Sequence, residues 1–448
     1  MAAVDSSLYE KFIIESVDGS KTANIAEGVV SFNYNEDLYS PMLTAKVLVI
    51  NTGNTIQGKD GKFESLYNGF PLRGGERVVI KISGNCGTNK GLDFSDKPSK
   101  YFYVGSITNV LIKDGKETFT LNLVSREAIT NETVRVGKRF PTSQKISDSV
   151  EDICKNYLSS DKLYDNDETE NPYGFIGNMK KPFTILTWLA SKSVPSKVAK
   201  GGSTAGYFFF ETQKGFRYKS VDQLIDQDPY EETYVYTPGI VEYKGPNNDF
   251  KILEYSTEKN QNLLDNLERG AFCSHRKYIN PLTFEYTPSP KCVFKLDDYS
   301  GKMKNLGGDI NVTLPTLSNN DSRTLASVPS RYITGFKDIG TIENDVSFSE
   351  NADATFIHSQ AMMRYNTLFT QLLVMTVPLN TNLIAGDIIK CQFPRTDQEE
   401  RKEIDRNQSG LYMIKELVHY FDASGSYTKL KLVRDTFGER ETWLKIIF

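Results

Sequence analysis

Apolar and polar residues follow the same order in two stretches of the chain that lie about 310 positions apart. The first stretch carries the pattern at Leu72, Gly75, Glu76, Val78, Ile80, Ile82, Phe102, Val104, Ile107, Leu111, Leu121, Leu123 and Val124. The second carries it at Leu383, Gly386, Asp387, Ile389, Cys391, Phe393, Tyr412, Ile414, Leu417, Phe421, Leu430, Leu432 and Val433. Gly75 and Leu121 are 46 positions apart, and Gly386 and Leu430 are 44 apart. The pattern therefore predicts one supersecondary unit that is used twice.

Each copy reads as antiparallel strands, because apolar residues alternate with polar ones at the period of two that a half-buried strand requires. A glycine followed by an acid, Gly75-Glu76 and Gly386-Asp387, opens each copy, where a residue without Cβ can take the positive φ of a turn. The later hairpins turn at 113–116 and 423–426. The alternative explanation is that two unrelated meanders share this spacing by chance. Against it, the match spans three strands and keeps the acid after the glycine.

The alternating segments at the start of the chain predict a tube-like β-barrel over 1–127. Strand signals occur at 9–16, 25–34, 43–50, 76–83 and 101–125. A sheet of this size with one polar face usually closes or pairs to hide its edges.

The period then changes, which predicts a helical α/β connecting domain over 128–204. Apolar residues over 147–158 form the stripe of an amphipathic helix. A second helix, over 182–193, begins with proline and is expected to point Phe183, Leu186, Trp188 and Leu189 inward.

A second barrel is expected over 205–256 and 366–437, with a hairpin at 207–218 and a strand at 369–377. It is interrupted by an insertion over 257–365 that packs with the connecting domain, and 438–448 form a C-terminal tail. Within the insertion we expect a polar helix over 257–270, an extended loop or partner-ordered arm over 302–350, and a helix over 352–365. The predicted fold class is thus mainly β with α+β parts: two homologous antiparallel tube-type β-barrels joined by an α/β segment, the second barrel interrupted by an insertion.

The composition is that of a globular protein with much β structure. The 448 residues allow two to four domains, and 39% are hydrophobic, 25% charged and 12% aromatic. The formal net charge of −4 leaves no basic field for gripping nucleic acid, which argues against a protein that reads DNA sequence. It does not exclude contact with DNA that slides past.

The cysteines favour reduced thiols in a protein made in a cytosol. Cys86, Cys154, Cys273, Cys292 and Cys391 are scattered and odd in number, without a Cys-x-x-Cys pair. The neighbours Cys273, His275 and Cys292 lack the fourth ligand and the tight spacing of a zinc site, so a strand with residues facing both ways is the better interpretation. We also expect no secretory signal at residues 1–10 and no membrane span, since the apolar run near 372–377 is short.

Catalytic patterns are weak or absent. The histidines are His275, His358 and His419; none lies in a metalloprotease motif, and His419 falls inside an alternating strand, where a packed histidine is the better interpretation. No nucleophile elbow, phosphate loop or dinucleotide fingerprint occurs. The acid pairs 231–232 and 297–298 could serve a glycosidase but look like solvated turns. We therefore predict no catalytic, cofactor-binding or metal-binding residues, no cofactor, and a protein that is not an enzyme.

The end of the second copy resembles a known family. Residues 409–421 and 427–435 resemble the last hairpin of the central baseplate hub proteins of contractile-tailed bacteriophages. Residues 102–126 are similar to the equivalent hairpin of that family's first tube domain, and 382–389 to its strand entry. The resemblance covers most of 8–437 and is weakest over 302–350.

The resemblance implies a structural virion protein. Hubs of this family are trimers whose two tube-like barrels per chain form a six-lobed ring, which adapts the hexameric tail tube to the trimeric spike. The implied partners are two further copies of the chain, a tail spike or spike-lysozyme protein and a tail tube or tube-initiator protein. The tape measure protein and baseplate wedge components are further candidates. The implied location is the tail baseplate of the virion, assembled in the host cytoplasm, with transient passage of double-stranded DNA and no membrane insertion by this chain.

Two other functions stay open at this point: a tail-associated cell-wall hydrolase, and a receptor- or carbohydrate-binding tail protein. Exposed aromatic residues clustered on loop tips would favour the second. If the ring forms, its inner face should be neutral or acidic, because clustered lysine and arginine would hold DNA phosphates.

Overall fold

The structure is a computed structural model of the whole chain. It describes residues 3–51, 56–57, 63–70, 72–113, 116–196, 204–238, 247–260, 263–289, 291–299, 303–308, 323–339, 351, 353, 356–395 and 404–438. The backbone is mostly antiparallel β structure, as expected.

The first unit follows the strand pattern predicted from the sequence. Its strands are β1 (Tyr9–Glu15), β2 (Thr22–Asn24), β3 (Val29–Asp37), β4 (Thr44–Asn51), β7 (Arg77–Ser83), β8 (Gly91–Asp93), β9 (Phe102–Lys113) and β10 (Lys116–Ser125). They lie in the order β3-β4-β10-β9-β7-β1-β2, with β8 beside β7. Short elements lie in its connections: β5 (Ile56–Gln57), β6 (Phe63–Glu64), α1 (Leu66–Gly69) and the 3₁₀ turns η1 (Ala26–Gly28) and η2 (Pro98–Lys100).

The second unit repeats this order with different strands. It contains β16 (Thr233–Tyr236), β17 (Lys251–Ile252), β18 (Glu254–Asn260), β22 (Gln371–Pro378), β23 (Ile388–Gln392), β24 (Gly410–Asp422) and β25 (Ser426–Arg434), with the turn η3 (Asn248–Phe250). Its order is β18-β22-β25-β24-β23-β16-β17. One strand differs in direction: β16 runs parallel to β23, whereas its counterpart β1 runs antiparallel to β7.

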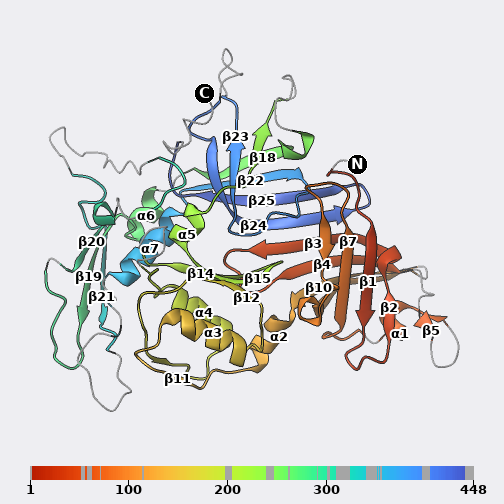
Figure 1. Cartoon of the computed structure of the whole chain (residues 1–448), viewed down its shortest axis with the longest axis horizontal. Coiled ribbons are helices and arrows are strands. Elements are labelled where there is room, and N and C mark those ends of the chain that lie inside the picture. Colours follow the sequence, from red (N-terminus) through yellow and green to blue (C-terminus); the bar gives the residue numbers. More distant parts are fainter. Residues whose placement is uncertain are drawn as a thin grey trace.

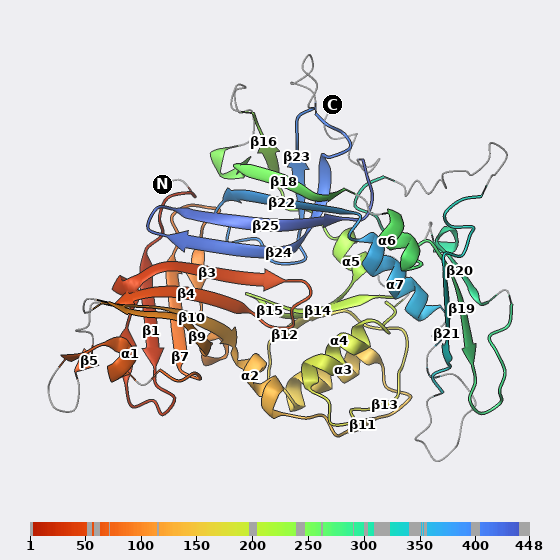
Figure 2. The same cartoon turned by 180° about the vertical axis from the view of Figure 1, so that it is seen from behind.

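The two units are joined edge to edge into a single 15-stranded sheet, because β24 also pairs with β3. Figures 1 and 2 show β22, β25 and β24 stacked directly above β3, β4 and β10. Within the described residues, no strand pairing closes either unit into a complete barrel.

A separate α/β body follows the first unit. It contains α2 (Arg126–Thr133), β11 (Arg139–Phe140), α3 (Ile146–Asn156), β12 (Leu163–Asn166), β13 (Phe175–Ile176), α4 (Pro182–Ala190), β14 (Tyr207–Thr212), β15 (Gly215–Ser220) and α5 (Val221–Asp226). Both predicted helices are present, but Trp188 does not point inward as expected. Its ring is 37% exposed and packs edge-on against Tyr173 and Phe175.

The β14–β15 hairpin corrects one predicted boundary. The sequence assigned it to the second barrel, which was expected to begin at 205. Instead β15 pairs in parallel with β12, so the hairpin belongs to the three-stranded sheet of the connecting body. Tyr207, Phe209, Phe216 and Tyr218 pack with α3 and α4 in that body's own core. The strands of the second unit therefore begin at β16.

The insertion corrects two further expectations. Residues 254–260 form β18, not the start of a helix over 257–270, because they pair with β22; only α6 (Leu263–Glu268) is helical, and Gly270 follows it with φ of +68°. Part of 302–350 is ordered as β21 (Arg331–Phe336), which pairs with β19 (Cys273–Ile279) beside β20 (Val293–Lys295). Much of 302–350 lies outside the described residues. The turn η4 (Leu296–Tyr299) and helix α7 (Ile357–Thr367) complete the insertion.

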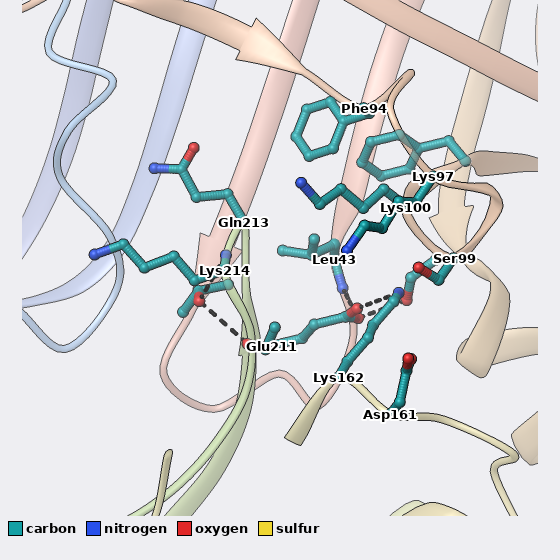
Figure 3. Close-up of a pocket in the computed structure, with 14 residues that line it drawn as sticks. Leu43, Phe94, Lys97, Ser99, Lys100, Asp161, Lys162, Glu211, Gln213 and Lys214 are labelled. Atoms are coloured by element: carbon teal, nitrogen blue, oxygen red, sulfur yellow. Dashed lines mark hydrogen bonds and ion pairs between the residues drawn. The ribbon is translucent and has the colours of Figure 1, made fainter. Parts of the chain in front are cut away.

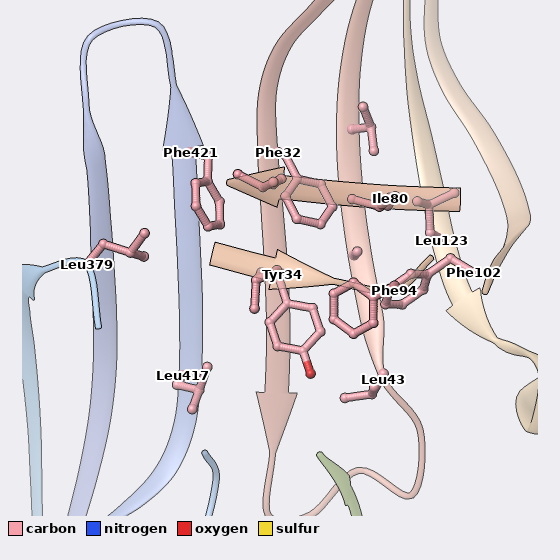
Figure 4. Close-up of a cluster of buried hydrophobic side chains, with 14 of the residues drawn as sticks. Phe32, Tyr34, Leu43, Ile80, Phe94, Phe102, Leu123, Leu379, Leu417 and Phe421 are labelled. Carbon is pink, nitrogen blue, oxygen red and sulfur yellow. The ribbon is translucent and has the colours of Figure 1, made fainter. Parts of the chain in front are cut away.

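Both units share one hydrophobic core. Side chains from β1, β3, β4, β7, β9 and β10 and from β22, β23, β24 and β25 form a single buried cluster. Figure 4 shows Phe32 and Tyr34 of β3 pointing into the same space as Leu417 and Phe421 of β24. Each fully buried side chain of this kind contributes roughly 1.5–3 kcal/mol, so the contact between the units is part of the core itself.

Candidate assembly site

The turns that open the two copies are equivalent in their hydrogen bonds. Gly75 N donates to Val104 O at 2.7 Å, and Gly386 N donates to Ile414 O at 2.8 Å. The return bonds also match, since Val104 N donates to Glu76 O and Ile414 N to Asp387 O, each at 2.9 Å. Both glycines have positive φ, +91° and +86°.

The acid after each glycine has the same task. A carboxylate oxygen of Glu76 accepts from Arg73 N at 2.6 Å, and one of Asp387 accepts from Ile384 N at 3.1 Å. Each acid therefore satisfies a backbone donor three residues before it in the turn. The repeated Gly-acid pair in the sequence has this physical cause.

The strand register is also the same in both copies. Ile107 lies opposite Leu121 on the β9–β10 ladder, and Leu417 lies opposite Leu430 on the β24–β25 ladder. Each ladder has an irregularity at the matching place, where Gly105 and Lys415 are the unpaired residues. A bulge at one matched position in two long hairpins is a specific feature, and the repeated pattern is confirmed up to Ile107 and Leu417, including the buried pair Ile80 and Cys391. The pairing of Leu111 with Phe421 is wrong. The β9–β10 ladder has a second irregularity, between Thr118 and Thr120, that the β24–β25 ladder lacks, so Ile112 takes the place of Phe421.

The long strands β9 and β24 have two halves with different neighbours. The first residues of β9 pair with β7, and those of β24 pair with β23 in the same register. The second half of β24, from Glu416 to Asp422, continues against β3 of the first unit. The second half of β9 pairs with β10 alone among the described strands, and its residues from 108 to 113 are exposed.

The β24–β3 junction is buried and aromatic. Phe421 lies opposite Phe32, and His419 lies opposite Tyr34 with its ring stacked on the phenol, 5.9 Å between centroids. His419 Nδ1 and Thr428 Oγ1 are 3.0 Å apart. Burial lowers the pKa of His419 to about 3, so this histidine is neutral and packed, as the sequence pattern indicated.

A buried carboxylate ties the two units to the connecting body. Glu36 of β3 accepts from Gln213 N at 2.6 Å, from Ala385 N at 2.7 Å and from the Tyr34 hydroxyl at 2.7 Å. These donors belong to the β14–β15 turn, to the turn before β23 and to β3 itself. Burial raises the pKa of Glu36 to about 7, against the lowering effect of these hydrogen bonds.

A second charged cluster lies where β10 runs into the connecting body. Lys162 Nζ contacts Glu127 at 2.7 Å and Glu211 at 3.0 Å, and Glu211 also accepts from Ser125 Oγ at 2.6 Å and from Leu43 N at 3.0 Å. A cavity of about 150 Å³ adjoins this cluster, and Phe94, Lys97, Lys100 and Lys214 are among the residues that line it (Figure 3). Because both carboxylates are held by several donors, the arrangement fastens the first unit to the connecting body.

Arg364 forms a third buried junction. Its guanidinium pairs with Asp222 at 2.8 Å and with Asp435 at 3.7 Å, and it donates to Lys304 O at 2.8 Å. Arg364 lies on α7, Asp222 on α5, and Asp435 just after β25. The insertion, the connecting body and the second unit therefore meet at one ion cluster.

The face of the joint sheet that points away from the core is mostly polar. Its side chains on the central strands, all exposed or half-buried, are Ser31, Asn33, Asn35, Thr44, Lys46, Leu48, Ile50, Thr118, Thr120, Asn122, Glu416, Val418, Tyr420, Asp422, Lys429 and Lys431. Lys431 and Glu416 form an ion pair at 2.8 Å. Charges of both signs are present on this surface, which we call the polar sheet face.

The residues considered for chemistry from the sequence do not gather into a site. Cys273 and Cys292 are buried beside the β19–β20 ladder, and His275 stacks on Tyr332. Asp297 and Asp298 lie exposed in η4. Across the described part of the chain, no group of three or more metal-ligating side chains occurs, and none of its helices is long and apolar enough to cross a membrane.

Sequence reasoning missed the three buried charge junctions. One signal was available for Glu36, because it continues the inward phase of Phe32 and Tyr34, where an acid is unexpected. Lys162, Glu211 and Arg364 come together from distant segments and have no comparable local signal.

No protein-family model and no curated protein matches the sequence. Two solved structures have its fold over nearly the whole chain. The tail protein from Neisseria meningitidis MC58 is 10% identical with a TM-score of 0.50, covering 95% of this chain and 97% of that chain. The 43 kDa tail protein of prophage MuSo2 from Shewanella oneidensis is 11% identical with a TM-score of 0.51, covering 95% and 98%.

A third structure is less similar. The Escherichia coli c3393 protein, a component of the type VI secretion system with structural similarity to the T4 bacteriophage tail proteins gp27 and gp5, has a TM-score of 0.42 at 10% identity, covering 92% of this chain and 76% of that chain. The fold of this chain is that of the two tail proteins above, so the resemblance found in the sequence is confirmed at the level of the fold.

Proposed function

We propose that this protein is the structural hub of a contractile phage tail baseplate. Three copies form a ring of six tube-like lobes, which adapts a six-fold tail tube to a three-fold central spike and surrounds the path of the DNA. The observation that carries the proposal is the equivalence of the two units, which match in their turn hydrogen bonds, ladder register and bulge position.

The internal β24–β3 contact supports this assembly. It joins the second unit of the chain to the first unit edge to edge, so one chain already contains two neighbouring lobes. A cyclic trimer then needs a single kind of further contact, between the first unit of one copy and the second unit of the next. The fold shared with two tail proteins supports a place in the tail.

The proposed partners are a spike or spike-lysozyme protein below the ring and a tube or tube-initiator protein above it. The tape measure protein and wedge components are further partners. We propose no catalytic role, since the buried carboxylates Glu36, Glu127 and Glu211 all serve as acceptors in structural networks. The polar sheet face is the proposed lumen surface. Among its side chains given above, three are lysines and two are acids, so it is less acidic than the sequence led us to expect, but the lysines are interspersed with acids and polar groups and do not form a continuous basic surface that would hold DNA.

Light scattering of the purified full chain, with and without its spike partner, tests the stoichiometry. Electron microscopy of the particle tests the position. We expect three copies on the tail axis at the baseplate. A chain that is monomeric in the assembled tail, or that lies at the periphery, contradicts the proposal.

A second candidate function, recognition of a receptor or other partner, is favoured by one observation. The insertion exposes several large aromatic side chains around the β19–β21 sheet: Phe284, Tyr286, Tyr332 and Phe336. Binding of the purified chain to host cells, lost on Tyr332→Ala with Phe336→Ala, would support this candidate over a purely architectural role.

A further inference from the structure

Among the described strands, two edges are open at the two ends of one run within the joint sheet. The run β18-β22-β25-β24-β3-β4-β10-β9 ends at one side in β18 and at the other in the second half of β9. Each of these edge segments has one ladder partner among the described strands, β22 for β18 and β10 for this half of β9. An open edge presents a row of backbone donors and acceptors to another chain.

The closed junction inside the chain shows how these two edges fit together. β24 is the counterpart of β9, and β18 is the counterpart of β3, because each pair has the same place in the strand order. Among the described strands, the outer half of β9 therefore lacks the neighbour that β3 provides for β24. In the same way, β18 lacks the neighbour that β24 provides for β3. We infer that the outer half of β9 pairs antiparallel with β18 of a second copy of this chain, in the register of the β24–β3 junction.

The register follows by transfer from one junction to the other. Within the chain, Tyr420 lies opposite Asn33 and Asp422 lies opposite Ser31. Through the β9–β10 and β24–β25 ladders, Leu111 is the counterpart of Tyr420 and Lys113 that of Asp422.

The counterparts of the β3 residues on β18 are found in the same way. β4 corresponds to β22, because β4 pairs with β10 in the same register in which β22 pairs with β25. Asn33 pairs with Lys46 in the first unit, and its counterpart in the second unit is Ser256. Ser31 pairs with Leu48, and its counterpart is Glu254. Leu111 of one copy therefore lies opposite Ser256 of the next, and Lys113 lies opposite Glu254.

The chemistry of the two edges is complementary in this register. Lys113 and Glu254 carry opposite charges, and directly opposed charges stabilise a ladder. Ile112 takes the place of Phe421, whose side chain is fully buried against Phe32, and so meets Tyr255. In the single chain Ile112 is 57% exposed and the adjacent Leu111 61% exposed.

This pairing joins unlike surfaces, so it propagates from copy to copy until the rotation closes a ring. It rests on the proposed function for the number of copies, but the pairing itself is independent of that number. The two can therefore fail separately.

Disulfide cross-linking tests the register. Leu111→Cys with Ser256→Cys places two thiols directly opposite on the exposed side of the ladder. We expect interchain disulfides that join successive copies, with a yield at least about fivefold above that of Leu111→Cys with Glu254→Cys, whose positions are diagonal and about 7–8 Å apart between Cβ atoms. Each single-cysteine variant and the native chain supply the background from the five native thiols.

A charged residue on the edge tests the contribution of the contact. We expect Ile112→Lys to weaken association of the full chain about tenfold or more, the loss that follows from keeping one buried aliphatic side chain out of the contact. Ile176→Lys is the matched control, because Ile176 is an exposed isoleucine on β13 of the connecting body, 42% exposed. The swap of Lys113→Glu with Glu254→Lys should restore association that each single change weakens.

The outcomes separate the two proposals. Equal cross-linking in both cysteine pairs, or unchanged association of Ile112→Lys in a chain that still forms trimers by light scattering, overturns the β9–β18 pairing and leaves the hub intact. Specific cross-linking in an assembly of a different number of copies upholds the pairing and overturns the trimeric hub.

Discussion

Phe32 and Phe421 lie opposite each other across the β3–β24 junction, with ring centroids 5.9 Å apart and the planes inclined by 33°. One ring comes from each unit, and both side chains are fully buried. The two units are therefore held in place by core packing, which salt does not screen as it screens surface charge.

Replacing Phe421 with alanine should destabilise the chain by about 3–5 kcal/mol, because it removes buried ring contacts and leaves a cavity between the units. Chemical denaturation of the full chain measures the change. Phe336→Ala is the matched control, since Phe336 is 72% exposed, and should change the free energy of unfolding by less than about 0.5 kcal/mol. Equal effects of the two variants would contradict the packed junction.

The two equivalent glycines should differ in their response to alanine. Alanine is strained at either position, because its Cβ disfavours the positive φ of the turn, at a cost of about 1–3 kcal/mol. A Cβ at Gly386 would also lie 3.1 Å from Phe210 Cζ and 3.3 Å from Leu224 Cδ2, whereas at Gly75 the nearest atom is Val17 Cγ2 at 3.5 Å. We therefore expect Gly386→Ala to lower the free energy of unfolding more than Gly75→Ala, and the reverse order would argue against the contact between β23 and the connecting body.

Arg364→Met should destabilise the chain by about 3–5 kcal/mol, because it leaves Asp222 and Asp435 buried without their cation. Lys100→Met removes the exposed pair with Asp96 and is the control, with an expected change of less than about 1 kcal/mol. Limited proteolysis should also cut the insertion of the Arg364 variant faster than that of the native chain. Similar stability of both variants would show that the buried cluster contributes little.

Glu36 should make stability depend on pH around neutrality. Its folded pKa of about 7 lies above the ordinary glutamate value of 4.5, so its contribution is fully present below about pH 4.5 and is lost as pH rises through about 7. The free energy of unfolding of the native chain, relative to Glu36→Gln, should fall by about 3 kcal/mol between these limits. Denaturation curves of both proteins from pH 5 to 8 measure this difference, and parallel pH profiles would mean that Glu36 is not titrating.

The strands of the two units could be predicted because their burial alternates. β4 and β10 follow the period of two along their whole length, and the Gly-acid pair marks where each copy begins. The spacing of each hairpin was enough to predict the register from the opening turn to Ile107 and Leu417. It was not enough for Leu111, because the second irregularity of the β9–β10 ladder leaves no mark in the apolar pattern.

Other elements could not be predicted, for physical reasons that differ. Residues 254–260 are polar along an open edge, so no buried face reveals the strand, and only the pairing with β22 determines it. β21 pairs in parallel with β19, more than 50 residues earlier, and such distant pairing has no local signal. The boundary at 205 was wrong because the β14–β15 hairpin is buried on both faces and looks like a barrel strand pair in sequence.

The β24–β3 pairing also has a consequence for how the chain is synthesised. β3 emerges early from the ribosome, but its neighbour β24 follows only after nearly 380 further residues. Until then the outer edge of β3, with Phe32 and Glu36, has no permanent cover, and contacts so distant in sequence form slowly. A nascent chain of this protein therefore passes through a long period in which the edge of β3 can be captured by the wrong strand, so recovery of soluble protein should improve when translation is slowed or a holding chaperone is supplied.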